Sequence, residues 1–360
     1  MNIDSYYIKG IPTEMSGFWY GISLIISTYL ALLFISEPLA QIIGVSSIPI
    51  SLICLIMGII IGNIIPLPSS WILGTNYIKQ NILLTAIVFL GLKISLAQVF
   101  KVGLNSLALI ISVFLLVFAF GIILKRIFFK DRGLINLIGI GTAICGVTAI
   151  MASSSVLKSK EQDVAIAVLI VVLLGSIGVF TYPFFVEWFF SSEISKGLFL
   201  GVGIHDTSQV LAASLIHFDI NGSSVVLETA TITKLIRNLF LALLIPYLAI
   251  KVQSKTVDQK TIFKQVTDNI PLFVYGFLFF ILLRTVCDQI FVSYLIWEQL
   301  LHWNDQLVST LFGLALIALG LSIKIKELKG LSFSPIVIGL IFSLGVFFVG
   351  IVIIPMVDYL

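Results

Sequence analysis

Two basic side chains lie inside an apolar stretch, where a charge needs a specific partner. In the segment Glu228-Thr-Ala-Thr-Ile-Thr-Lys-Leu-Ile-Arg-Asn238, Arg237 lies nine residues after Glu228. At 1.5 Å per residue this distance is roughly 13 Å, close to the middle of a membrane core about 30 Å thick. A cation at that depth costs at least about 2.5 kcal/mol, so Lys234 and Arg237 are expected to face a cavity, a carboxylate or an anionic substrate. The alternatives are a structural ion pair, or a Lys234 side chain that reaches the outer surface.

A second polar cluster, His205-Asp-Thr-Ser-Gln-Val210, interrupts another apolar stretch. His205 can donate, accept or take up a proton near neutral pH, and Asp206 is the only carboxylate that we place well inside a span. Gln209 shares a helix face with His205, and Ser208 supplies a hydroxyl beside them. We expect this cluster to contact the substrate or to bind a coupling proton. The alternatives are that Asp206 only neutralises the nearby cations and that the histidine is a satisfied structural group.

A run of small residues could place backbone groups in the same site. Between positions 139 and 155, twelve of seventeen residues are Gly, Ala, Ser, Thr or Cys, and Gly141 and Gly146 favour local unwinding. An unwound segment at membrane depth can bind a substrate through its freed N–H and C=O groups. The alternative is a packing helix without a ligand. The residues expected to line the site here are Thr142, Cys145, Gly146 and Thr148.

The composition is that of an integral membrane protein. Apolar residues make up 59% and charged residues 11% of 360 residues, with a mean hydropathy of +1.15, whereas soluble domains are about 25% charged. Apolar runs recur along the whole chain, which predicts a single membrane domain over 1–360. The three cysteines form no disulfide framework or metal-ligand pattern, and no Walker loop or catalytic triad is present. We therefore expect no cofactor, no metal, no nucleic acid partner and no enzymatic activity.

The apolar runs predict eleven transmembrane helices. With this count, fourteen Lys and Arg residues fall on the side of the N-terminus and four on the other side. The positive-inside rule then places the N-terminus in the cytoplasm and the C-terminus outside. The expected spans are 17–36, 48–65, 81–98, 103–124, 133–157, 164–187, 197–216, 228–250, 270–287, 306–323 and 332–355.

An odd number of spans fits one peripheral helix followed by two five-helix units of opposite orientation. We expect 17–36 to be the peripheral helix, 48–187 the first repeat and 197–355 the second. The fifth and tenth spans would then correspond. Gly313 and Gly320 are expected to give the tenth span weak points of its own.

The sequence resembles the YeiH-like family of bacterial sulfate exporters over nearly its whole length. The resemblance rests on Gly141-Thr-Ala-Ile-Cys-Gly-Val-Thr-Ala-Ile150, His205-Asp-Thr-Ser-Gln-Val210 and Lys234-Leu-Ile-Arg237. It implies a place in the bacterial cytoplasmic (inner) membrane and a relation to the bile-acid-symporter and sodium/proton-antiporter folds. These folds have inverted repeats, broken helices that cross at the centre, and separate core and scaffold domains. The resemblance also implies a homodimer. The chain differs from the usual pattern in Asp206, where Glu is common, and in Val147-Thr148, where smaller residues are common.

The resulting hypothesis is a secondary transporter of a small anion, such as sulfate, an organosulfonate or a carboxylate, that works by alternating access. Lys234 and Arg237 would supply positive charge, while His205 and Asp206 would bind the coupling proton, with sodium as the alternative ion. Truncating Arg237 to alanine is expected to abolish anion uptake and to leave the protein folded. Two alternatives remain: a cation/proton antiporter on the same fold, and a membrane sensor or scaffold that does not transport.

Overall fold

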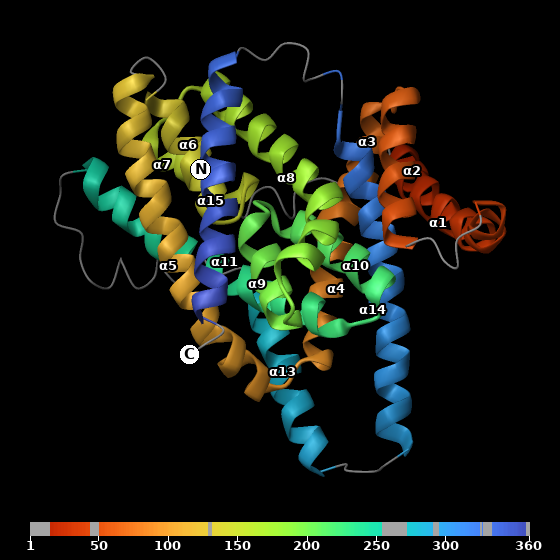
Figure 1. The fold of residues 1–360 in the computed structure, drawn as a ribbon. Coiled ribbons are helices and arrows are strands. Elements are labelled where there is room, and N and C mark those ends of the chain that lie inside the picture. Colours follow the sequence, from red (N-terminus) through yellow and green to blue (C-terminus); the bar gives the residue numbers. More distant parts are fainter. Residues whose placement is uncertain are drawn as a thin grey trace. The chain divides into compact units, whose positions relative to one another are not determined.

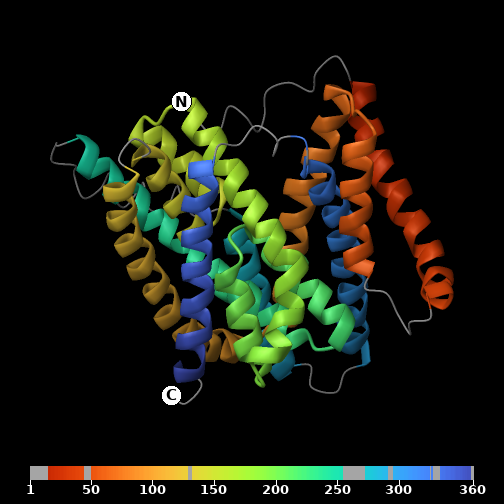
Figure 2. The ribbon, with the colours of Figure 1, turned by 45° about the horizontal axis from the view of Figure 1, so that its top comes forward.

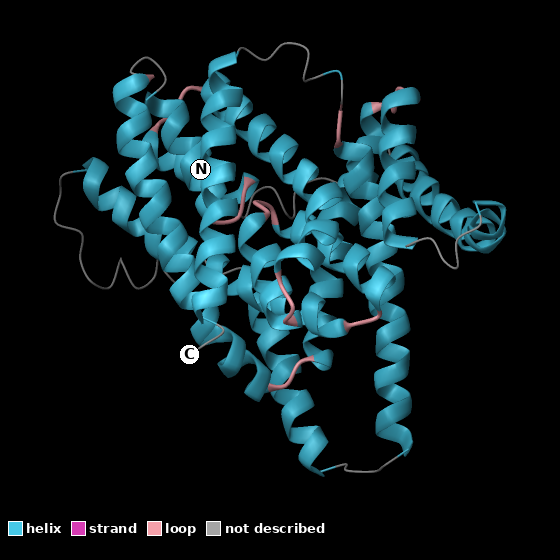
Figure 3. Ribbon diagram, in the orientation of Figure 1, coloured by secondary structure: helices cyan, strands magenta, loops and turns pink. Residues whose placement is uncertain are grey.

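The computed structural model describes residues 15–43, 50–128, 132–253, 272–290, 295–324, 326 and 333–357. Almost all of these residues are helical, and no strand occurs among them (Figure 3). The expected all-α class is confirmed for this part of the chain. The helices pack in two compact units, Met1–Ala86 with Gln306–Ile325, and Ile87–Asp305 with Lys326–Leu360.

The helices follow the expected order along the chain. In Figure 1 they are α1 (Met15–Ile43), α2 (Ile50–Ile64), α3 (Ser69–Tyr77), the π-helical η2 (Ile78–Ile82), α4 (Leu83–Leu90), the 3-10 helix η3 (Gly91–Lys93), α5 (Leu96–Ile127), α6 (Arg132–Ala143), α7 (Val147–Leu157), α8 (Glu161–Phe189), α9 (Glu193–Gly203), α10 (Thr207–Asn221), α11 (Ser224–Gln253), α13 (Leu272–Ile290), α14 (Leu295–Ser322) and α15 (Phe333–Val357).

Six of the described helices are long and apolar enough to cross a membrane, namely α1, α5, α8, α13, α14 and α15. Each of the eleven expected spans contains helix, although two of them begin well before the expected residue. The third helical segment begins at Ser69, and α14 begins at Leu295. The polar stretch 288–306, which precedes the expected tenth span, therefore contains much helix. Polar residues oppose burial in lipid, but they do not oppose helix formation.

In the first unit, glycines bring helices into close contact. A Cβ added to Gly58 of α2 would lie 2.3 Å from the carbonyl oxygen of Ile317, and one added to Gly320 would lie 2.3 Å from that of Leu55. The expected weak points in the tenth span are absent, because α14 continues unbroken through Gly313 and Gly320. These glycines permit close helix packing instead of unwinding.

In the second unit, α9 lies at the centre. Every residue from Ser195 to Gly203 is buried, and the helix packs against α11 and α15. Gly197 and Gly201 face Thr229 and Thr233 of α11 so closely that an added Cβ would lie 2.5 and 2.7 Å from their Cβ atoms. Figure 2 shows α15, in dark blue, running alongside α5 and α8. This packing holds α11, with its two basic residues, against the centre of the unit.

Candidate functional site at a crossing of broken helices

The fifth apolar segment is broken, as its small residues predicted. Helix α6 ends at Ala143, and α7 begins at Val147. Between them Gly146 adopts φ +67° and ψ −122°, a conformation open mainly to glycine. The Gly146 N–H donates to the Gly141 carbonyl at 3.0 Å, which closes the turn.

The seventh apolar segment is also broken, although the residues 197–216 were expected to form one span. Helix α9 ends at Gly203, and α10 begins at Thr207. Asp206 caps α10, because its Oδ1 accepts from the Ser208 N–H at 2.9 Å and from the Ser208 hydroxyl. Asp206 followed three residues later by Gln209 is a capping-box spacing, and this signal could have located the break.

The two breaks, 144–146 and 204–206, meet at a place that we call the crossing. A Cβ added to Gly146 would lie 3.2 Å from the Cα, Cβ and Oδ2 atoms of Asp206. The N-termini of α7 and α10 are therefore adjacent, and the Asp206 carboxylate lies at both. Helix N-termini carry partial positive charge, so a carboxylate is favourable there.

The meeting of the breaks predicts that Gly146→Ala is destabilising. A methyl group would strain the backbone by about 1–3 kcal/mol and would press on Asp206. Gly121→Ala in α5 is the control, since nothing lies within 4 Å of its added Cβ. In that helix alanine is favoured by about 0.5–1 kcal/mol. Melting curves in detergent should therefore shift in opposite directions, and equal shifts would contradict the prediction.

Lys234 of α11 lies at the C-terminal ends of the broken helices. Its Nζ donates to the carbonyls of Ile144 at 3.1 Å, of Ile204 at 3.0 Å and of His205. The residue is 1% exposed, so it does not reach the surface. A cation at a helix C-terminus complements the partial negative charge of the carbonyls.

Arg237 binds the same two helix ends one turn further along α11. Its Nε donates to the Ala143 carbonyl and its Nη1 to the Val202 carbonyl, both at 2.6 Å, and its Nη2 donates to Thr142. Arg237 is 0% exposed. Neither cation forms a salt bridge with a carboxylate of the described residues, although Asp206 interacts with Lys234 through space. Together the two cations satisfy six backbone carbonyls.

His205 and Gln209 connect the crossing to neighbouring helices. The Nε2 atom of His205 lies 2.7 Å from the Ser343 hydroxyl of α15. The Gln209 side chain donates to the Val172 carbonyl at 2.9 Å and to the Ser176 hydroxyl at 3.0 Å, both in α8. His205 Nδ1 and Gln209 Oε1 are buried, and neither has a hydrogen-bond partner among the residues that the structure describes.

Exposure distinguishes the two sides of the crossing. Thr142 and Cys145, expected to line the site, are buried beside the capped C-terminal ends. Thr148 is exposed, and Asp206 and Ser208 are partly exposed at the N-terminal ends. The accessible side of the crossing is thus the one with positive helix ends and hydroxyl groups.

Three further residues belong to this arrangement and were not among the expected site residues. Asn238 donates to the Thr207 hydroxyl at 3.1 Å, which links α11 to the start of α10. Its Oδ1 is buried and has no hydrogen-bond partner in the described part of the chain. Ser343, the partner of His205, lies in an apolar helix that gave no sequence signal.

Comparison with known proteins identifies the family. The family described as "Conserved hypothetical protein 698" matches residues 21–339. The chain belongs to this family. Similar proteins include a UPF0324 membrane protein of Streptococcus agalactiae, which is 30% identical over 82% of this chain and 86% of the relative. A UPF0324 membrane protein of Pasteurella multocida is 31% identical over 87% of this chain and 89% of the relative. A UPF0324 membrane protein of Clostridium tetani is 29% identical over 90% of this chain and 94% of its own. No solved structure matches.

Membership of the Conserved hypothetical protein 698 family agrees with the apolar helices in placing the chain in a membrane. The names of these relatives describe membrane proteins and state no substrate or activity.

Proposed function

We propose that this protein is a secondary transporter of a small anion, in the class of sulfate, organosulfonates or carboxylates, that works by alternating access. The observation that carries the proposal is the polarity of the crossing. The negative helix ends are buried and neutralised by Lys234 and Arg237, whereas the positive ends are accessible. Half-helix N-termini at membrane depth are suited to anionic groups.

The groups around the accessible ends can complete an anion site. Thr148 carries a hydroxyl in the first turn of α7. Ser208, in the first turn of α10, donates its hydroxyl to Asp206 and would have to release it to bind an anion. Lys234 and Arg237 contribute two positive charges behind them, against the single carboxylate of Asp206. Asp206 and His205 are the proposed coupling groups for a proton, with sodium as the alternative ion.

The proposal includes an architecture. We propose eleven crossings in a bacterial cytoplasmic membrane, with the N-terminus inside and the C-terminus outside, and a homodimer. The charge distribution of fourteen to four supports this orientation. Among the residues described, the proposed repeat 48–187 contains the break between α6 and α7, and the proposed repeat 197–355 contains the break between α9 and α10. The two breaks lie at different positions within the repeats. The continuous α14 does not support pairing of the fifth and tenth spans.

The test is a matched pair of substitutions at Thr148, the second residue of α7. In Thr148→Glu a new carboxylate competes with a substrate anion, while an acidic first turn favours the helix by about 0.3–1 kcal/mol. Thr148→Gln has the same size without the charge. The measurement is uptake, into proteoliposomes, of radiolabelled sulfate or of another anion that the wild type takes up. Uptake by the glutamate variant is expected to be about tenfold lower than uptake by the wild type, or lower still. Uptake by the glutamine variant is expected to stay near that of the wild type. Undiminished uptake by the glutamate variant would contradict the proposal.

The second candidate is a cation/proton antiporter, favoured by the partly exposed carboxylate of Asp206. In that case Thr148→Glu should preserve or increase sodium- or potassium-driven proton movement. A sensor or scaffold would show neither anion uptake nor cation exchange in the wild type.

A further inference from the structure

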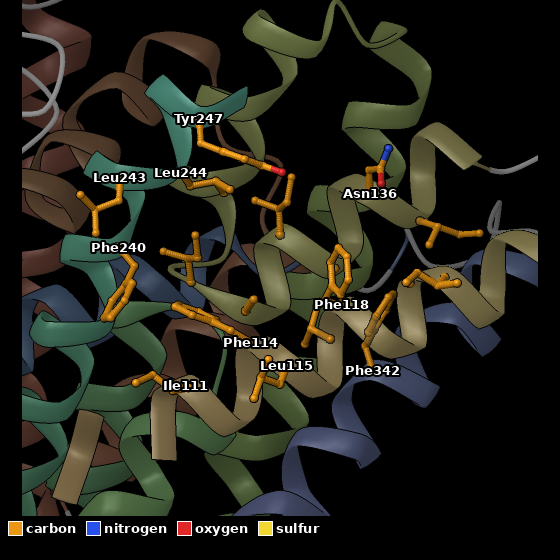
Figure 4. A pocket seen from close by; sticks show the side chains of 18 of the residues that line it. Ile111, Phe114, Leu115, Phe118, Asn136, Phe240, Leu243, Leu244, Tyr247 and Phe342 are labelled. Carbon is orange, nitrogen blue, oxygen red and sulfur yellow. The ribbon is translucent and has the colours of Figure 1, made fainter. Parts of the chain in front are cut away.

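An apolar groove lies within the second unit, separate from the accessible face of the crossing. Its volume is about 560 Å³, and it is lined by α5, α6 and α11, with Phe342 of α15 (Figure 4). This volume lies in the range of about 300–1,000 Å³ that is typical of ligand sites. Almost all lining side chains are apolar.

The groove has a closed floor and an open side. Phe342 and Val117 on the floor are 0% and 8% exposed, whereas Leu115 and Phe118 are 66% and 69% exposed. Apolar side chains this exposed on a membrane helix face lipid. Acyl chains therefore have direct access to the groove.

Few of the residues that line the groove are polar. Asn136 lies near the start of α6, and Tyr247 lies near the end of α11. Figure 4 shows them on opposite sides of the upper part of the view, with Ile111 at the bottom. Lys125, in the last turn of α5, also lines the groove. Ile111 and Lys125 are 14 residues apart on α5, which is roughly 21 Å along a helix. One leaflet of a hydrocarbon core about 30 Å thick measures about 15 Å, so the groove has the length of an acyl chain together with its headgroup region.

We propose that the groove binds one acyl chain of an anionic glycerophospholipid, with the headgroup at Lys125, Asn136 and Tyr247. The positive charge of Lys125 and the amide of Asn136 match a phosphate. The apolar floor matches the chain. This site is independent of the proposed transport function.

The lipid would also contact the crossing. Ala143 and Ile144 line the groove, and their carbonyls accept from Arg237 and Lys234. A bound chain thus fills the space beside the capped end of α6 and packs against the two residues that carry these carbonyls. Lipid binding is therefore expected to stabilise the folded protein.

The experiment measures melting temperature in detergent with added phosphatidylglycerol or phosphatidylcholine of identical chains. Wild type should be stabilised by phosphatidylglycerol at a concentration about tenfold lower than by phosphatidylcholine. Gly121→Phe fills the groove, since nothing lies within 4 Å of its added Cβ, and should lose the response to both lipids. Lys125→Gln should lose only the preference for phosphatidylglycerol. Leu104→Phe, at an exposed position of the same helix, should behave as wild type.

Equal responses of wild type to the two lipids, or an unchanged response in Gly121→Phe, would overturn the proposal. If Gly121→Phe does not fold, a benzophenone photocrosslinker in place of Phe118 supplies the test. Irradiation in an equal mixture of the two lipids should then give mainly the phosphatidylglycerol adduct by mass spectrometry. The same crosslinker at Leu104 should show no preference. Equal adducts at Phe118 would overturn the proposal as well.

Discussion

Arg237→Met is expected to lower the free energy of unfolding by at least about 3 kcal/mol. The substitution removes the guanidinium donors of the Thr142, Ala143 and Val202 carbonyls, and each buried carbonyl left unsatisfied costs about 1–3 kcal/mol. It also removes the charge that complements the C-terminal ends of α6 and α9. Thermal unfolding in detergent, followed by circular dichroism, should show a large decrease in melting temperature.

Arg284→Met is the matched control for this prediction. Arg284 in α13 is partly exposed, pairs with Asp288 at 2.6 Å, and donates to a single carbonyl, that of Leu92, at 3.3 Å. Such a pair contributes about 0–1 kcal/mol, so the control should melt close to wild type. Equal melting of the two variants would show that Arg237 is not structural. The expectation from sequence that truncation at Arg237 leaves folded protein is revised by these hydrogen bonds.

Asp206→Asn is expected to uncouple anion uptake from the pH gradient and to leave the fold intact. Asparagine caps a helix as well as aspartate does, and its oxygen can accept from the Ser208 N–H. The variant removes the negative charge at the N-termini of α7 and α10, and with it the group that is proposed to bind a proton. Coupling energies of about 1–3 kcal/mol correspond to about 5–150-fold, so gradient-driven accumulation in proteoliposomes should fall about fivefold or more.

Asp219→Asn makes the same chemical change near the other end of α10 and should leave accumulation unchanged. Wild-type accumulation by Asp206→Asn would exclude Asp206 as the coupling group. Absence of anion uptake in the wild type, together with loss of cation-driven proton movement in Asp206→Asn, would favour the cation/proton antiporter instead.

The sequence located one of the two breaks because its cause is local. Gly146 requires a positive φ, and small residues surround it, so the interruption is written in the segment itself. The second break was not predicted, because its polar residues were interpreted only as binding groups and not as a helix cap. Asp206 is the cap of α10 as well as a candidate coupling group.

The roles of the two cations show where sequence reasoning ends. Burial of Lys234 and Arg237 could be predicted, since both lie deep in an apolar span, and the structure finds both fully buried. Their hydrogen-bond partners could not be predicted. The carbonyls that they bind belong to backbone with no distinguishing side chain, so no residue type signals the contact.

The sequence by itself determined the membrane class, the helical order and the break at Gly146, because hydropathy, span length and glycine geometry act within one segment. Only the tertiary structure decided that the two breaks meet, that Lys234 and Arg237 cap both, and that α5, α6 and α11 enclose an apolar groove. Lys234 and the Ile144 carbonyl are separated by 90 residues, and Arg237 and the Ala143 carbonyl by 94. Contacts at such separation depend on how whole helices pack, and packing is set by the fold rather than by any single segment.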